Sequence, residues 1–191
     1  MRISVIGDGS VGSALARGFE KAGHTVSTVG NNQGRIKELA GSGEVIVLAV
    51  PFGALDQVAA TIGNAADGKV VVDVTNALTP DFKLALGHTT SGAEELQKKL
   101  PNAKVVKGFN TVFSSAMETG QNTGTQLTAF IAGDDTEAKN TVIELAKGNG
   151  LDAVDAGPLA NARLLEPMAF LQIQLGFMFG HGPNIGFKLV R

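Results

Sequence analysis

The glycine-rich stretch VIGDGSVG, close to the first residue, constrains the fold more than any other feature of the chain. Gly7, Gly9 and Gly12 follow the spacing G-x-G-x-x-G, directly after the apolar run RISVI and directly before a helical pattern. In dinucleotide-binding folds the first glycine permits a tight turn, the second lets the backbone approach a pyrophosphate, and the third lets the helix pack on the strand. The N–H groups at the helix start then favour phosphate. The stretch therefore predicts a strand–turn–helix unit that binds a dinucleotide.

The rest of the chain alternates short β-rich apolar runs with helical patterns, which is typical of an α/β sheet. The two most apolar runs, EVIVLAV and KVVVDVT, indicate parallel strands that are covered on both faces. We expect strands within residues 2–6, 25–29, 44–50, 69–75, 103–110, 127–133 and 152–157. We expect helices within residues 10–23, 30–43, 91–100, 134–150 and 158–180, the last of them bent near Pro167.

One connection is shorter than the doubly wound fold normally has. Only GNNQGRIKELAGSG separates the second strand from the third, which leaves room for one short helix and no further strand. Residues 24–29 therefore form the edge, where Thr25, Ser27 and Thr28 suit partial contact with water. The predicted fold is a Rossmann-like, doubly wound, mostly parallel sheet that lacks one edge strand. We expect residues 1–157 to form the nucleotide-binding domain and residues 158–191 a small helical segment packed on it as one compact unit.

Composition excludes several functions. The formal net charge of −2 provides no basic surface, so nucleic acid is not an expected partner. The absence of cysteine removes disulfides, thiolate nucleophiles and thiolate metal sites, and no other metal-ligand spacing is present. No targeting segment is visible, and the longest apolar run, VIVLAVPFGAL, is shorter than the roughly 20 residues of a membrane helix. We expect a soluble cytoplasmic protein with no membrane association.

The residues after the second strand bear on the choice of cofactor. An acid about 20 residues beyond the glycine turn normally binds the ribose 2′-OH of NAD. At that distance the chain has Asn31 and Asn32, with Arg35 beyond them. The amides and the guanidinium can donate hydrogen bonds to a 2′-phosphate, which favours NADP(H). In the alternative reading, the asparagines only form a turn and Arg35 is solvated.

Three further segments follow predicted strands and so reach the edge where open α/β sheets bind ligands: AVPFGAL, DVTNAL and GFNTVF. Asn76, Asn110 and Thr111 can offer polar groups to the ribose and the carboxamide, and Phe52 can cover the adenosine. The alternatives are turn residues for the asparagines and core for Phe52. The predicted cofactor-binding residues are Gly7, Asp8, Gly9, Ser10, Val11, Gly12, Asn31, Asn32, Arg35, Val50, Pro51, Phe52, Leu55, Asn76, Asn110, Thr111 and Ser114.

Candidate acids and bases are few. His24 precedes the edge strand, His88 precedes a helix, and Lys107 lies within a strand, where a strand face suits it better than a site. His181, in the glycine-rich stretch after the last helix, is the one histidine that could act as a proton donor. We therefore predict no catalytic side chain. Hydride exchange between two bound rings requires alignment more than a protein acid or base.

Several stretches together resemble the NADPH-dependent coenzyme F420 reductase family, the 8-hydroxy-5-deazaflavin:NADP oxidoreductases, whose relatives include the cytosolic domain of the six-transmembrane metalloreductases. They are VIGDGSVG, VPFGAL, DVTNAL, TTSGAEELQKKLPNAKVVKGFNTVF, AGDD, DAGPLANARLLE and GFKLV. The resemblance implies a Rossmann domain with a small helical part, assembled as a homodimer. It implies NADP(H) on the glycine turn and nicotinamide near NTVFS. The second ring would stack beside Ile185 and Gly186.

The expected function is hydride transfer between NADP(H) and a second ring cofactor, a deazaflavin such as coenzyme F420 or a flavin. Two alternatives remain open at this stage. One is an NADPH-dependent reductase of a small carbonyl or imine, with His181 as the proton donor. The other is a non-catalytic module that senses NADP(H).

Overall fold

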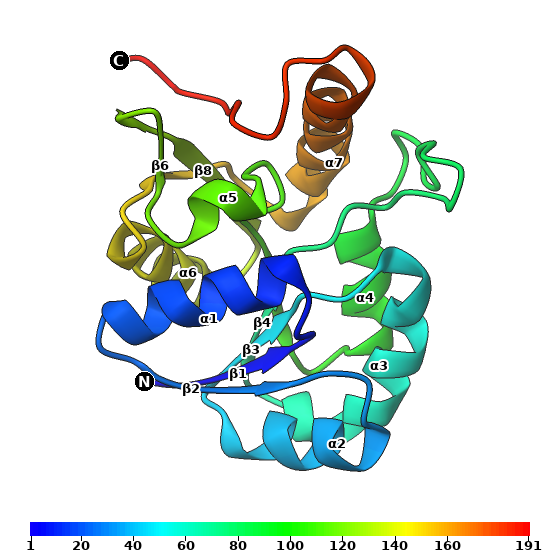
Figure 1. The fold of residues 1–191 in the computed structure, drawn as a ribbon. Helices are drawn as coiled ribbons and strands as arrows, with labels where there is room; N and C mark the ends of the chain where they lie inside the picture. The colour runs from blue at the N-terminus through cyan, green and yellow to red at the C-terminus, as the bar shows by residue number, and fades with distance from the viewer.

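The computed structural model describes all 191 residues and contains a seven-stranded sheet in the order β2-β1-β3-β4-β5-β8-β9 (Figure 1). All neighbouring pairs are parallel except β5 and β8, which run antiparallel. This confirms the predicted Rossmann-like, mostly parallel sheet. The strands are β1 Arg2–Ile6, β2 Thr25–Val29, β3 Val45–Leu48, β4 Val70–Asp73, β5 Lys104–Lys107, β8 Thr128–Gly133 and β9 Asp152–Asp155.

The missing outer strand is confirmed, because β2 is the edge of the sheet. A single helix, α2 (Gln33–Ser42), connects it to β3. In β2 only Val29 is buried, whereas all four residues of β3 are buried. The polar residues of β2 therefore face water, as expected for an edge.

Two helical layers cover the sheet (Figure 1). One core cluster joins α1 (Ser10–Lys21), α5 (Ser114–Met117) and α6 (Thr136–Gly148) to one face. The other cluster joins α2, α3 (Leu55–Ile62) and α4 (Gly92–Lys99) to the opposite face. No helix in the structure combines the length and the apolar character needed to cross a membrane.

Side-chain caps begin two of these helices. Ser91 caps α4 by accepting a hydrogen bond from the Glu94 N–H at 3.2 Å. Asp135 caps α6 by accepting one from the Ala138 N–H at 2.8 Å. Each cap satisfies an N–H group that the first helical turn leaves free. A short ribbon, β6 (Gln121–Asn122) with β7 (Thr125–Gln126), precedes β8.

The carboxyl-terminal helix is composite. A 3₁₀ turn at Leu159–Asn161 leads into α7 (Ala162–Ile173), which a π-helical turn at Gln174–Met178 extends. The sequence predicted a bend near Pro167, which lies inside α7. The irregular turn begins further along the chain, at Gln174. The last residues return to β8, where the Thr128 N–H donates to the Phe187 carbonyl at 2.9 Å. The predicted boundary between residues 157 and 158 stays a prediction.

Candidate functional site

The glycine turn between β1 and α1 is tightly closed by backbone. A Cβ added to Gly7 would lie 2.0 Å from the Ala49 carbonyl oxygen, and one added to Gly12 would lie 1.9 Å from the Gly7 carbonyl oxygen. Gly7 also has a φ of +115°, which L side chains rarely adopt. Gly9 caps α1 without a side-chain hydrogen bond and has open space around it. The first N–H groups of α1 are therefore accessible to an anion, so the turn fits a pyrophosphate.

A cavity of about 440 Å³ opens beside this turn, and we call it the nucleotide cavity. Its walls come from the glycine turn, the end of β2, α2, the end of β3 and α3. It is lined by Gly7, Asp8, Gly9, Gly30, Asn31, Gln33, Ile36, Ala49, Val50, Pro51, Ala54, Gln57, Val58 and Thr61. Of the predicted cofactor-binding residues, this cavity brings together Gly7, Asp8, Gly9, Asn31, Val50 and Pro51.

Other predicted residues near it have different places. The Asn32 side chain caps α2 by accepting from the Arg35 N–H at 3.2 Å. Arg35 itself is exposed on α2, outside the lining of the cavity. Leu55 is 2% exposed and belongs to the core, and Phe52 is half-buried against the same core cluster. Phe52 therefore packs against the core, which was the alternative to a role in covering the adenosine, and that role stays a prediction.

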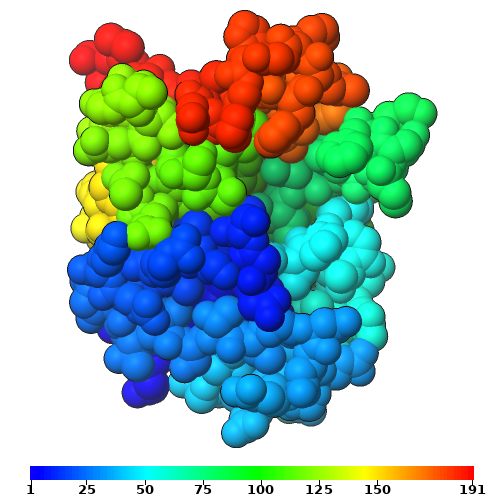
Figure 2. All heavy atoms as spheres, in the orientation of Figure 1, coloured from blue at the N-terminus to red at the C-terminus, as the bar shows by residue number.

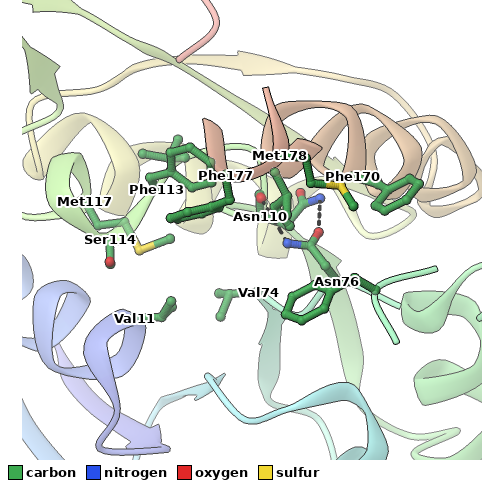
Figure 3. A pocket seen from close by; sticks show the side chains of 13 residues that line it. Val11, Val74, Asn76, Asn110, Phe113, Ser114, Met117, Phe170, Phe177 and Met178 are labelled. Carbon is green, nitrogen blue, oxygen red and sulfur yellow. Dashed lines mark hydrogen bonds between the residues drawn. The ribbon is translucent and has the colours of Figure 1, made fainter. Parts of the chain in front are cut away.

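A second cavity of about 610 Å³ lies at the carboxyl-terminal ends of the parallel strands, as the nucleotide cavity does, and we call it the ring cavity (Figure 3). Ten of its thirteen lining residues are hydrophobic. In Figure 2 the surface is hollowed between the blue amino-terminal segment, the green loop and the orange α7 region. The lining residues are Val11, Val74, Asn76, Phe82, Asn110, Val112, Phe113, Ser114, Met117, Phe170, Ile173, Phe177 and Met178. Four of them were predicted: Val11, Asn76, Asn110 and Ser114.

The two asparagines of this cavity hold each other in place (Figure 3). The Asn110 amide nitrogen donates to Asn76 Oδ1 at 3.1 Å and to the Leu165 carbonyl at 2.9 Å. The Asn76 amide donates to the Asn110 carbonyl at 3.3 Å. Asn110 Oδ1 is buried and has no partner within the chain, and the same is true of the hydroxyls of Thr75 and Thr111. Such groups are rare in native proteins, so Asn110 Oδ1 is an unsatisfied polar atom beside an otherwise apolar wall.

A buried ion cluster lies behind the asparagines. Lys107 Nζ lies 3.0 Å from Asp73 Oδ2 and 2.9 Å from Glu166 Oε1, and it donates to the Thr75 carbonyl at 2.6 Å. Burial by itself would lower the pKa of Lys107, but the two carboxylates outweigh it and raise the pKa. The amine is therefore charged at neutral pH.

The ion cluster also joins distant elements. Glu166 on α7 accepts hydrogen bonds from the Gly92 and Ala93 N–H groups at the start of α4, at 3.0 and 3.3 Å. Asp73 ends β4 and Lys107 ends β5. Lys107 lies outside both cavities, as expected, but its partners Asp73 and Glu166 were not predicted from the sequence. The signal was present, because each of the three charges interrupts an apolar run.

The histidines lie outside the ring cavity. His24 precedes β2, and burial together with the amino-terminal charge lowers its pKa. His88 is exposed in the loop before α4. His181 is exposed and borders a separate cavity of about 280 Å³ together with Ile185 and Gly186. The structure therefore does not bring the residues expected to select the second ring into the ring cavity.

Most of the apolar lining of the ring cavity was not predicted from the sequence. Phe113 and Phe177 pack with their ring centroids 5.5 Å apart, although they are far apart in the sequence. Phe82 borders the cavity from the loop before α4, is 60% exposed, and has a φ of +56°. An exposed phenylalanine in the left-handed region is unusual for a structural residue. The only sequence signal for this lining is the apolar, glycine-containing end of the last helix.

Comparison with known proteins agrees with the geometry. The family model described as "NADP oxidoreductase coenzyme F420-dependent" matches residues 2–43 and 34–77. A crystal structure from Arthrobacter sp. FB24 with a provisional F420-dependent NADP-reductase name covers 100% of both chains at 27% identity, with a TM-score of 0.91.

Two curated relatives are longer than this chain. The F420-dependent NADP reductase of Methanocaldococcus jannaschii is 29% identical over 75% of this chain and 66% of its own length. Metalloreductase STEAP3 of Rattus norvegicus is 32% identical over 86% of this chain and 36% of its own length. The chain thus spans between about a third and two thirds of these relatives. In its glycine turn, its sheet and these matches, the chain is similar to the coenzyme F420-dependent NADP oxidoreductase family, whose model matches its first 77 residues.

Proposed function

We propose that the chain is an oxidoreductase that transfers a hydride between NADP(H) and a second ring cofactor, a deazaflavin such as coenzyme F420 or a flavin. The observation that carries the proposal is the pair of cavities at one sheet edge. The nucleotide cavity is built on glycine backbone, and the ring cavity is almost wholly apolar. The first turn of α1 connects them, because Gly9 lines one cavity and Val11 lines the other.

In this proposal NADP(H) spans both cavities. Gly9, Ser10 and Val11 hold the pyrophosphate with the open N–H groups of α1. The adenosine enters the nucleotide cavity, and its 2′-phosphate lies near Asn31, Asn32 and Arg35. When bound, the nicotinamide would supply or accept the hydride, and Asn76 and Asn110 would be the polar residues nearest to its carboxamide.

The residues of the ring cavity would align the rings and exclude water, without acting as acid or base. The only polar lining side chains are those of Asn76, Asn110 and Ser114, and none of them titrates near neutral pH. Phe113, Phe177 and other apolar walls confine two flat rings face to face, which is the geometry that hydride transfer requires. His181 lies outside this cavity, so a carbonyl or imine reductase would lack the proton donor considered for it.

We also propose that two copies of the chain associate. Exposed apolar side chains gather on α7 and the π-helical turn: Leu164 is 65% exposed, Leu171 49%, Phe177 65% and Met178 63%. Leu164 and Leu171 are two helical turns apart and share one face. A second copy covering this face would remove them from water. Sedimentation at several protein concentrations tests the dimer. We further propose that the protein is located in the cytoplasm.

A spectrophotometric assay tests the proposed reaction. NADPH binding is first measured by titration, and NADPH oxidation is then followed with a deazaflavin and with free flavins as acceptors. Oxidation that depends on one of these acceptors is the expected result. Tight NADPH binding with no acceptor reduced would contradict the proposal and support a module that senses the nucleotide.

A further inference from the structure

The carboxylate of Asp8 occupies the place of an absent side chain. A Cβ added to Gly30 would lie 2.3 Å from Asp8 Oδ2, 2.7 Å from its Cγ and 2.8 Å from its Oδ1. The Asp8 carboxylate therefore lies against the backbone at position 30, in the volume that a side chain there would fill. Both residues line the nucleotide cavity.

Position 30 adjoins Asn31 and Asn32, which lie where dinucleotide-binding folds carry their selective acid. It follows β2 directly, and an acid at the end of the second strand binds the ribose 2′-OH of NAD. In this chain the position is glycine and the next two residues are amides, so the sequence suggests that no carboxylate is present. In the structure, Asp8 of the glycine turn places a carboxylate beside position 30.

The Asp8 carboxylate is also free to bind a ligand. The hydrogen bond at Asp8 uses its backbone carbonyl, which accepts from Ser13 Oγ at 2.9 Å. No hydrogen bond or ion pair within the chain engages its side chain, and the residue is exposed at the cavity wall. Two ribose hydroxyls can donate to such a carboxylate, whereas a 2′-phosphate is repelled by it.

We infer that Asp8 determines nucleotide specificity and lets the chain bind NADH beside NADPH. The inference rests on the proposed nucleotide site and not on the hydride acceptor. Arg35 and the amides of Asn31 and Asn32 favour the 2′-phosphate, and Asp8 opposes them at the same corner. The dissociation constants for NADPH and for NADH should therefore differ by less than about tenfold, which is the size of effect expected from a single charge interaction.

The experiment measures dissociation constants for NADPH and NADH through the fluorescence of the reduced nicotinamide, at one ionic strength. Asp8→Asn keeps the shape of the side chain and removes its charge. We expect it to tighten NADPH roughly tenfold and to weaken NADH several-fold. Asp67→Asn is the control for net charge, because Asp67 is exposed and precedes β4, at the end of the strand opposite to the cavities. It should change neither constant.

A second variant tests the position of the charge. Asp8→Ser combined with Gly30→Asp moves the carboxylate to the end of β2 and vacates the space that the new side chain needs. It should restore the NADH binding that Asp8→Asn loses. Arg35→Ala should act in the opposite sense to Asp8→Asn, weakening NADPH far more than NADH.

Equal changes for both nucleotides in Asp8→Asn, or the same shift in Asp67→Asn, would overturn the inference. Because the titration needs no acceptor, the outcomes remain separable from those of the proposed function. A shifted nucleotide ratio without any acceptor turnover would uphold Asp8 and contradict hydride transfer. Acceptor turnover with an unchanged ratio of the NADPH and NADH dissociation constants would uphold hydride transfer and contradict the role of Asp8.

Discussion

The nucleotide cavity and the ring cavity share a sheet edge but are built in different ways. The nucleotide cavity draws on residues 7–61, which come from the ends of three successive strands and from α2 and α3 and include three glycines. The ring cavity draws on residues 11–178 and consists of side chains from the first helix, two strand ends, a loop and the last helix. The first is a local structure, and the second forms only when distant segments pack together.

The comparison with the family model follows the same division. The match at residues 2–77 contains the whole nucleotide cavity but only Val11, Val74 and Asn76 of the ring cavity. Binding through backbone requires glycines at fixed spacing, which any family pattern records. Binding through apolar packing accepts many residue types, so its walls vary with little loss of stability. The family match therefore speaks for the nucleotide more directly than for its hydride partner.

The largest effect should come from the buried ion cluster that anchors the ring cavity. Lys107→Met leaves the carboxylates of Asp73 and Glu166 buried without their cation, which should cost about 3–5 kcal/mol of unfolding free energy. Urea unfolding at neutral pH measures it. Because the pKa of Lys107 is raised, its contribution is fully present below its unfolded-state pKa of about 10.4 and is lost only at higher pH.

Lys104→Met is the matched control on the same strand. Lys104 pairs with Asp135 at 3.0 Å, but both side chains are more than a third exposed, so the loss should be at most about 1 kcal/mol. If the two variants lost equal stability, the ion cluster would not be an anchor of the ring cavity.

A smaller effect, confined to the nucleotide cavity, is expected from Gly12→Ala. The new methyl group would overlap the Gly7 carbonyl, and the turn must open to admit it. NADPH binding should weaken roughly a hundredfold, equivalent to about 2.7 kcal/mol. Gly41→Ala in the exposed part of α2 is the control, since its Cβ meets nothing within 4 Å and alanine favours a helix. Unchanged NADPH affinity in Gly12→Ala would show that the turn does not hold the nucleotide.

The smallest effect should separate the two cavities most sharply. Phe82→Ala removes an exposed ring from the wall of the ring cavity only, so the KM of the acceptor should rise about tenfold, in line with a lost aromatic contact. The dissociation constant of NADPH should not change. Phe82→Tyr keeps the ring and should behave like the parent. An equal loss of NADPH affinity in Phe82→Ala would show that Phe82 contacts the nucleotide rather than the acceptor.

These differences explain how far the sequence could predict the molecule. The glycine turn and the edge strand β2 depend on residues close together in the chain, and both have the predicted form. The ion cluster depends on Asp73, Lys107 and Glu166, whose pairing only the packed fold creates. The position of Asp8 beside Gly30 similarly requires β1 and β2 to lie side by side.

The C-terminal segment shows the same limit. Local patterns identify α7 but do not reveal the π-helical turn that directs Phe177 and Met178 to the ring cavity. They also do not show that the chain then returns to β8. This return puts Ile185 beside Gln172, away from the ring cavity. The placement of the second ring near Ile185 stays a prediction.

The fixation of α7 at one end has a consequence for engineering. Glu166 is bound to Lys107 and to the start of α4, so that end of the helix cannot shift without disturbing the sheet. Phe177 and Met178 lie about three helical turns further on, are mostly exposed, and still border the ring cavity. Libraries that vary these two positions could reshape the ring cavity while the scaffold stays rigid. Acceptor choice and fold stability would then be separately adjustable in one helix.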